Sequence, residues 1–100
     1  NAVRAVEYFT LAVKADPNNA LLFNNLGVAH QLCNALPKAL AAFEKAIALR
    51  NDYAEALNNQ GVVLRQLGRM KEAGAAFDRA VRLKPHYQDA LKNRAALFNA

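Results

Sequence analysis

One spacing of 34 residues recurs along this chain of 100 residues. When Ala20–Tyr53 is laid over Ala54–Tyr87, the two segments align without a gap. The identical positions include Asn24/Asn58, Asn25/Asn59, Gly27/Gly61, Ala39/Ala73, Phe43/Phe77, Ala46/Ala80 and Tyr53/Tyr87. A fixed period of this length is typical of a stacked solenoid, in which each unit buries its apolar face only against its neighbours. The repeat therefore predicts a binding surface rather than a reaction centre.

The apolar residues are spaced for helices. They make up 54% of the chain, with many alanines and few β-branched residues, which favours helix over strand. In Leu36–Leu49 they recur at three- and four-residue steps and form one stripe. Asparagine, proline and glycine fall between such stretches, where helices should end. We therefore expect an all-α fold of six helices, near residues 2–15, 20–33, 37–49, 54–67, 71–83 and 88–99.

The repeat also predicts the core. Gly27 and Gly61 stand in the middle of expected helices, where glycine costs roughly 1 kcal/mol relative to alanine. We explain these glycines by close contact with the alanines of the next helix, such as Ala39 and Ala46. The phenylalanines would fill the space between consecutive units. The expected core comprises Phe9, Phe43, Phe77, Ala39, Ala73, Gly27 and Gly61.

These spacings resemble the tetratricopeptide repeat. The matching residues are Phe23-x-x-Leu26-Gly27-x-x-His30 with Ala39-x-x-x-Phe43 and Ala46, and then Leu57-x-x-Gln60-Gly61-x-x-Leu64 with Ala73-x-x-x-Phe77, Ala80 and Pro85. Phe23 and Leu57 replace the usual tryptophan, and Asn51 replaces the closing proline. The resemblance implies an antiparallel helix-pair solenoid, a superhelix that serves as an interaction module. Residues 1–19 would be the second helix of a truncated repeat, 20–53 and 54–87 two full repeats, and 88–100 a capping helix.

The resemblance also implies where a ligand binds, because the first helix of each pair lines the concave surface in this family. The residues expected in this groove are Asn24, Asn25, Val28, Gln31, Glu55, Asn58, Asn59, Val62, Arg65, Asp89, Lys92 and Asn93. Each asparagine amide can both donate and accept, so a row of them can pair with a peptide backbone. The row is similar to the asparagine ladder of O-linked N-acetylglucosamine transferases and related bacterial repeat proteins. Alternatively, these amides bond to neighbouring helices and only stabilise the stack.

A better-known use of the family is the capture of heat-shock chaperone tails by a clamp of asparagine, lysine and arginine. Here Glu55 and Asp89 stand where the resemblance would require lysine, and Val28 and Val62 stand where it would require asparagine. Carboxylates repel an acidic C-terminus. Chaperone-tail capture is therefore not the expected function.

Catalytic and metal-binding constellations are scarce. The chain has no serine, and its one threonine is Thr10, which excludes a serine triad. His30 and Cys33 lie three residues apart but have no evident orienting third group, and with His86 they do not make a zinc ligand set. We expect no enzyme activity, no metal and no cofactor. Cys33 is expected to be a buried structural thiol, compatible with a reducing cytoplasm.

The net charge of +5 comes mainly from the second half of the chain. Its basic residues from Arg65 onward are Arg65, Arg69, Lys71, Arg79, Arg82, Lys84, Lys92 and Arg94. They are spread over several helices and loops without interleaved aromatic residues to stack on bases, so nucleic acid is not the expected partner. Acidic protein partners account for the charge equally well. No apolar run approaches the roughly 20 residues that a membrane span needs.

The sequence thus predicts a non-enzymatic interaction module that binds an extended peptide or a helix of a protein partner. Two alternatives remain. The chain could be a self-associating scaffold, a homodimer through its N-terminal helix, because Val3, Val6 and Phe9 lack a preceding helix to cover them. It could also be the substrate-recognition fragment of a larger enzyme such as a glycosyltransferase.

Overall fold

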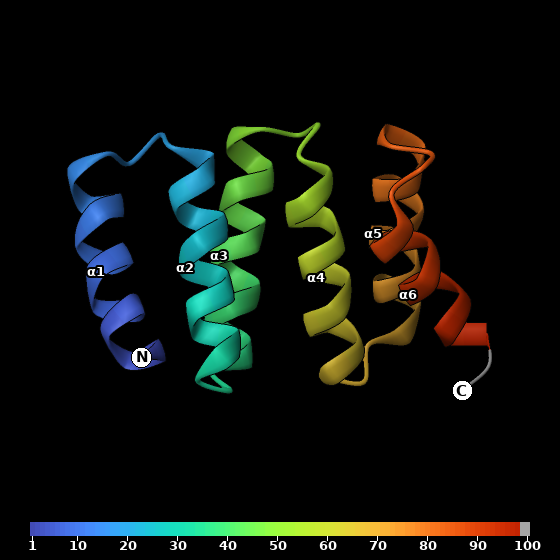
Figure 1. Cartoon of the computed structure of the whole chain (residues 1–100), viewed down its shortest axis with the longest axis horizontal. Coiled ribbons are helices and arrows are strands. Elements are labelled where there is room, and N and C mark those ends of the chain that lie inside the picture. Colours follow the sequence, from blue (N-terminus) through green and yellow to red (C-terminus); the bar gives the residue numbers. More distant parts are fainter. Residues whose placement is uncertain (99–100) are drawn as a thin grey trace. The chain divides into compact units, whose positions relative to one another are not determined.

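The computed structural model describes residues 1–98, which form six α-helices and no strand. The helices are α1 (Ala2–Ala15), α2 (Ala20–Leu32), α3 (Leu36–Leu49), α4 (Ala54–Gln66), α5 (Met70–Leu83) and α6 (Gln88–Phe98) (Figure 1). Their bounds agree within one residue with the predicted ones, except that the predicted end at residue 99 lies outside the described residues. The chain divides into two compact units, Asn1–Asn51 and Asp52–Ala100.

Unit 1 holds α1, α2 and α3, with α2 packed against both of the others. Neighbouring helices run in opposite directions, because short turns join them (Figure 1). The core of this unit lies between α2 and α3, and Phe43 in its centre is fully buried. The other buried apolar side chains of unit 1 are Leu26, Ala29, Ala39, Leu40, Ala42, Ala46 and Ile47.

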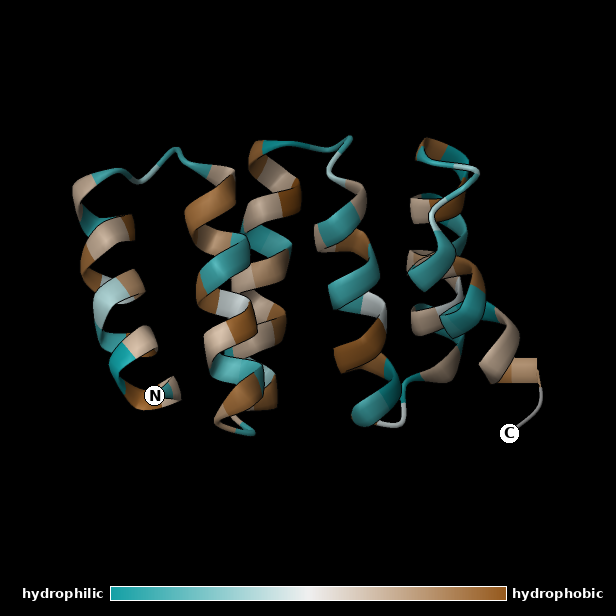
Figure 2. Cartoon of the chain, viewed as in Figure 1, coloured by the Kyte–Doolittle hydropathy of each residue, from teal (hydrophilic) through white to brown (hydrophobic). Residues whose placement is uncertain are grey.

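Unit 2 repeats this pairing with α4 and α5, and α6 packs against α5 and also touches α4. Its largest fully buried side chains are Phe77, Leu57 and Val63. Figure 2 shows hydrophobic and hydrophilic residues alternating along α4, as expected for a helix that buries one face. The connections between helices are mainly hydrophilic (Figure 2).

The repeated glycines are explained by the repeated phenylalanines. A Cβ atom at Gly27 would lie only 2.5 Å from Cε1 of Phe43, and one at Gly61 would lie 2.5 Å from Cε1 of Phe77. Each ring therefore packs directly against the backbone of the first helix of its pair, Phe43 against α2 and Phe77 against α4. The predicted close approach is present, but its partner is an aromatic ring rather than an alanine.

The predicted core residue Phe9 and the large apolar residue Met70 are not buried. Phe9 is only half-buried, and α1, all of which is described, contains no buried residue. Met70 is 48% exposed at the start of α5. Periodicity alone identifies the face on which a side chain lies, but the helix that packs against this face decides its burial.

The ends of α2 and α4 share one hydrogen-bonded turn. Asn34 and Gly68, which are one period apart, both have positive φ angles, 58° and 81°. After each of them the chain folds back, and Ala35 N donates to His30 O while Arg69 N donates to Leu64 O, both at 2.9 Å. Glycine and asparagine are the residues that tolerate this left-handed conformation best. This turn returns the chain for the second helix of each pair.

Gly74 differs from the other helical glycines, and replacing it by alanine should stabilise the protein. Its Cβ would lie 3.6 Å from Cδ1 of Leu97, an ordinary van der Waals contact. Because alanine is favoured over glycine in a helix, we expect Gly74→Ala to raise the free energy of unfolding by about 1 kcal/mol. Urea denaturation followed by circular dichroism measures the change. A loss of stability would show that this site is closely packed.

Candidate functional site

The first candidate surface lies on α2 in unit 1, where the predicted groove residues follow one another at helical spacing. Asn24 is buried, whereas Asn25, Val28 and Gln31 are each half-buried. The α2 helix begins after Asn19, whose side chain accepts a hydrogen bond from the backbone N–H of Leu22 at 3.3 Å. This cap sets the start of the helix and so the face that the asparagines occupy.

In unit 2 the predicted asparagines lie on two helices, and the structure joins them. Asn93 Nδ2 on α6 donates to Asn58 Oδ1 on α4 at 3.0 Å. Asn58 is buried, with 6% of its surface exposed, and it also hydrogen-bonds to the Tyr87 side chain. The amide of Asn58 is therefore engaged within the protein. For this residue the alternative interpretation, in which the amide stabilises the stack, describes what the structure shows.

Acidic residues flank this amide pair. Glu55 accepts a hydrogen bond from Lys84 Nζ at 2.5 Å, although both side chains remain about half exposed to solvent. Burial raises the pKa of the Tyr87 phenol, and the nearby carboxylates of Glu55 and Asp89 raise it further, while the hydrogen bond with Asn58 lowers it. Glu55, Asn58 and Asp89 thus all influence the protonation of one tyrosine. We call the residues Glu55, Asn58, Lys84, Tyr87, Asp89 and Asn93 the polar cluster.

Lys84 and Tyr87 were not among the predicted site residues. Both lie in the connection between α5 and α6, and Lys84 Nζ is 5.9 Å from the centre of the Tyr87 ring. Tyr87 could have been found from the sequence, because Tyr53 precedes it by one period. Lys84 has no such signal, since Arg50 at the equivalent position is only a conservative match.

The remaining predicted residues of unit 2 line the same two helices. Asn59, Val62 and Arg65 are half-buried on α4, and Asp89 and Lys92 are exposed on α6. Thus α4 and α6 present the half-buried or exposed side chains that a ligand could contact, next to an amide pair that is already bonded. The role of these residues toward a ligand stays a prediction.

The groups considered for catalysis lie outside this cluster. Cys33 is exposed at the C-terminal end of α2, so the prediction of a buried thiol is wrong. It ends the helix immediately before the left-handed Asn34, and that turn leaves its side chain in solvent. Burial and the nearby Lys38 ammonium lower the pKa of His30. Within residues 1–98, no three histidine, cysteine or acidic side chains are grouped closely enough to hold a metal ion.

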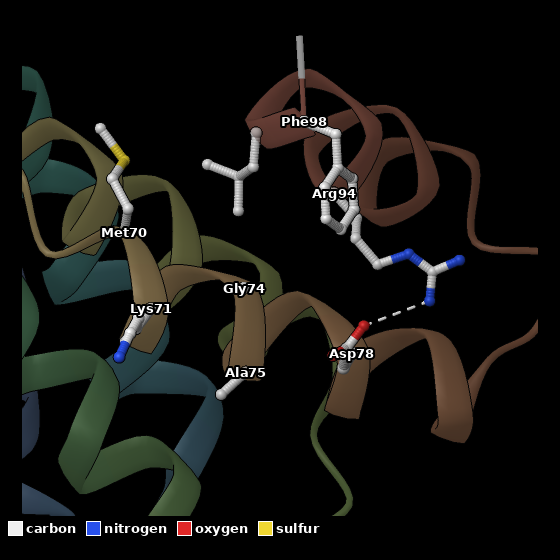
Figure 3. A pocket seen from close by; sticks show the side chains of 8 residues that line it. Met70, Lys71, Gly74, Ala75, Asp78, Arg94 and Phe98 are labelled. Atoms are coloured by element: carbon white, nitrogen blue, oxygen red, sulfur yellow. Dashed lines mark hydrogen bonds and ion pairs between the residues drawn. The ribbon is translucent and has the colours of Figure 1, made fainter. Parts of the chain in front are cut away.

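No helix in the described part of the chain has the length and apolar character that crossing a bilayer requires. A pocket of about 440 Å³ lies between α5 and α6, lined by Met70, Lys71, Gly74, Ala75, Asp78, Arg94, Leu97 and Phe98 (Figure 3). The register explains this space, because Gly74 stands where Val6 and Leu40 stand in the earlier helices. It lies apart from the polar cluster.

Comparisons with known proteins agree with this geometry. A family model described as tetratricopeptide repeat matches residues 34–88. A search of curated protein sequences gave no match. The tetratricopeptide repeat domain of Arabidopsis OM64 is 26% identical, with a TM-score of 0.95 over 98% of this chain and 81% of that one.

Two further solved structures are similar. The second tetratricopeptide repeat domain of human RPAP3, solved with the HSP70 peptide SGPTIEEVD, is 28% identical, with a TM-score of 0.92 over 97% of this chain and 81% of that one. MamA is 26% identical, with a TM-score of 0.93 over 98% of this chain, which spans 57% of the MamA chain. These likenesses confirm the predicted all-α helix-pair solenoid.

Proposed function

Because the chain belongs to the tetratricopeptide repeat family, it is a protein-interaction module, and we propose that it binds the backbone of an extended peptide. The peptide would contact the asparagine-bearing faces of α4 and α6 in unit 2. The observation that carries this proposal is the hydrogen bond between Asn58 and Asn93. It holds the Asn93 amide in one orientation before any ligand arrives.

A fixed amide binds a peptide at a lower entropic cost than a mobile one. The bond to Asn58 uses one N–H of Asn93, and an asparagine amide carries a second N–H and a carbonyl oxygen. A peptide backbone offers the matching acceptor and donor at every residue. This pairing does not depend on the side chains of the peptide, so specificity would come from the neighbouring charged groups.

Those charges favour a peptide without an acidic end. Glu55 and Asp89 both raise the pKa of Tyr87, and Glu55 is also paired with Lys84. The HSP70 peptide in the RPAP3 complex ends in EEVD. A tail of this kind would bring three more carboxylate side chains and its C-terminal carboxylate toward Glu55 and Asp89. We therefore propose an internal peptide segment as the ligand.

The test begins with a peptide selected from a random display library against the immobilised 100-residue chain. We expect Asn59→Ala to weaken binding of this peptide by about tenfold, the loss of one or two hydrogen bonds, while the helix content is kept. Asn18→Ala, at an exposed loop asparagine, is the matched control and should bind like the unaltered chain. Isothermal titration calorimetry measures the affinities.

Asn58→Ala provides the contrast, because its buried amide bonds within the protein. It should lower the melting temperature more than Asn59→Ala does. If Asn59→Ala lowers the melting temperature and leaves peptide affinity unchanged, the asparagines only stabilise the stack. The proposal of backbone binding then fails.

Self-association is a second candidate, and α1 is the observation that favours it. Val3, Tyr8 and Leu11 are 61%, 65% and 67% exposed on this helix. So many large apolar side chains on one short helix indicate a surface that another helix covers. A homodimer through α1 is one way to cover it.

A further inference from the structure

Within residues 1–98, α1 and α6 each leave one face that no other helix covers. None of the α1 residues, all of them described, is buried, and Tyr8 and Leu11 are among the most exposed apolar side chains. On α6, Phe98 is 83% exposed. In the repeat register α1 is the second helix of a pair, and α6 is the first helix of a pair. The exposed face of α1 is therefore one that a first helix would cover, and the exposed face of α6 is one that a second helix would cover.

We call a repeat with both of its helices, α2–α3 or α4–α5, a complete pair. The α4–α5 pair shows which positions of the two helices meet. A pocket of about 210 Å³ between these helices is lined by Gln60 and Leu64 of α4 and by Glu72, Ala75, Ala76 and Arg79 of α5. One period after the α4 residues come Arg94 and Phe98 of α6. Two periods before the α5 residues come Arg4, Glu7, Tyr8 and Leu11 of α1. By the repeat register, α6 of one molecule could therefore pair with α1 of a second molecule through the same positions.

The residues brought together in this way match in charge. Arg94 takes the place of Gln60, and Glu7 takes the place of Ala75. In the complete pair neither of those positions is charged. At these two repeat positions, the arginine and the glutamate thus occur only on α6 and α1, the helices whose pairs are incomplete within residues 1–98, and they carry opposite charges. Arg94 already bonds to Asp78 through Nη1 at 3.2 Å, and its guanidinium carries further N–H donors for a second carboxylate (Figure 3).

The apolar residues match as well. Phe98 takes the place of Leu64, and Tyr8 takes the place of the buried Ala76, so two aromatic side chains meet. In unit 1 the Lys45 ammonium lies 6.0 Å from the Phe23 ring of the partner helix. At the position of Lys45 α1 carries Leu11, and at the position of Phe23 α6 carries Leu91. Between two copies, two leucines would therefore meet where a lysine and a phenylalanine meet in unit 1.

We propose that α1 of one copy of this chain docks on α6 of a second copy, as α5 docks on α4. Glu7 of the first copy pairs with Arg94 of the second, and Tyr8 and Leu11 cover Phe98 and Leu91. The contact joins two different surfaces, α1 of one copy and α6 of another. This inference does not depend on peptide binding, and it gives the self-association candidate a defined geometry.

Ala95 should weaken this contact between α1 of one copy and α6 of the other. In the complete pairs the phenylalanine ring lies against Gly27 or Gly61, where a Cβ atom would be 2.5 Å from the ring. The equivalent residue of α6 is Ala95, and the equivalent ring of α1 is Phe9. The Ala95 methyl group holds that ring away. Ala95→Gly should therefore tighten self-association by roughly tenfold, although glycine weakens the α6 helix itself.

Sedimentation equilibrium from about 1 to 500 µM tests the proposal, a range that covers the affinities expected of a weak contact. The unaltered chain should associate as its concentration rises. Glu7→Arg and Arg94→Glu should each weaken association by roughly tenfold, because they place like charges together. An equimolar mixture of the two variants should associate like the unaltered chain, since each supplies the charge that the other needs. Circular dichroism checks that each variant is folded.

Asp78→Asn is the matched control, because it removes the Arg94 ion pair inside one molecule and leaves the proposed contact intact. It should associate at least as strongly as the unaltered chain. A chain that is monomeric at every concentration overturns the proposal. Association that Arg94→Glu leaves unchanged overturns it too and indicates a dimer through α1 alone.

Discussion

Replacing Phe43 by alanine is expected to lower the free energy of unfolding by about 3–5 kcal/mol, the largest effect of any single substitution considered. The ring is fully buried in unit 1, and it fills the space directly against Gly27. Because alanine is too short to reach that glycine, the substitution leaves a cavity as well as losing apolar contact. A domain of this size has only about 5–15 kcal/mol of stability to lose. Much of the helix content should therefore be lost on mild heating.

Thermal unfolding followed by circular dichroism measures this loss. Phe9→Ala is the matched control, because Phe9 holds the same position of the repeat but is only half-buried. It should lower the melting temperature clearly less than Phe43→Ala does. An equal effect of the two substitutions, or an unchanged melting temperature for Phe43→Ala, would contradict the assignment of the core.

The second large effect is expected from adding a single methyl group. Gly61→Ala should cost about 1–3 kcal/mol, since its Cβ would lie 2.5 Å from Phe77 Cε1 and the fully buried ring has no space to move into. The clash outweighs the gain of about 1 kcal/mol that alanine brings to a helix. Urea denaturation of the variant measures the net change.

Two comparisons show whether the clash is the cause. The same substitution at Gly74, in the same unit, is expected to stabilise, so the sign of the effect should differ between the two sites. Phe77→Leu makes room at the ring position, and the cost of Gly61→Ala should shrink when both changes are combined. If Gly61→Ala costs as much in the Phe77→Leu variant as in the unaltered chain, the glycine is needed for another reason.

The sequence was sufficient for the fold because three signals agreed at every helix. Apolar spacing defined each helix, the period defined the pairing, and residues such as Pro37 and Gly68 marked where helices begin and end. Pro37 lies in the first turn of α3, where its missing N–H removes no intrahelical bond. Such agreement between local preference and repeat is what makes a solenoid readable from one sequence.

Burial was less predictable than helix position. Phe9 shares its repeat position with Phe43 and Phe77, but those rings lie against a glycine in the first helix of their own pair. Within residues 1–98 no such helix lies against Phe9, which is therefore less buried. Cys33 is apolar in character, yet it falls at a helix end where the turn exposes it. Both outcomes depend on the neighbours of a residue in space, which a period in the sequence does not contain.

The candidate site was predicted in part. The asparagines of α4 and α6 are brought together, but the sequence could not show that Asn58 and Asn93 bond to each other. Nor could it show that Lys84, from the connection after α5, reaches Glu55 at the start of α4. Side-chain partners between helices depend on crossing geometry and reach, and helical spacing alone leaves these undetermined.

The central claim is that the asparagine-bearing helix faces bind a peptide backbone, and nuclear magnetic resonance tests it most directly. The ¹⁵N-labelled chain would be titrated with the selected peptide while the side-chain amide signals of the asparagines are followed. We predict that the signals of Asn59 and Asn93 shift together and saturate, whereas that of Asn18 stays in place. Shifts confined to α1 and to the exposed end of α6, with unchanged asparagine amides, would contradict the claim.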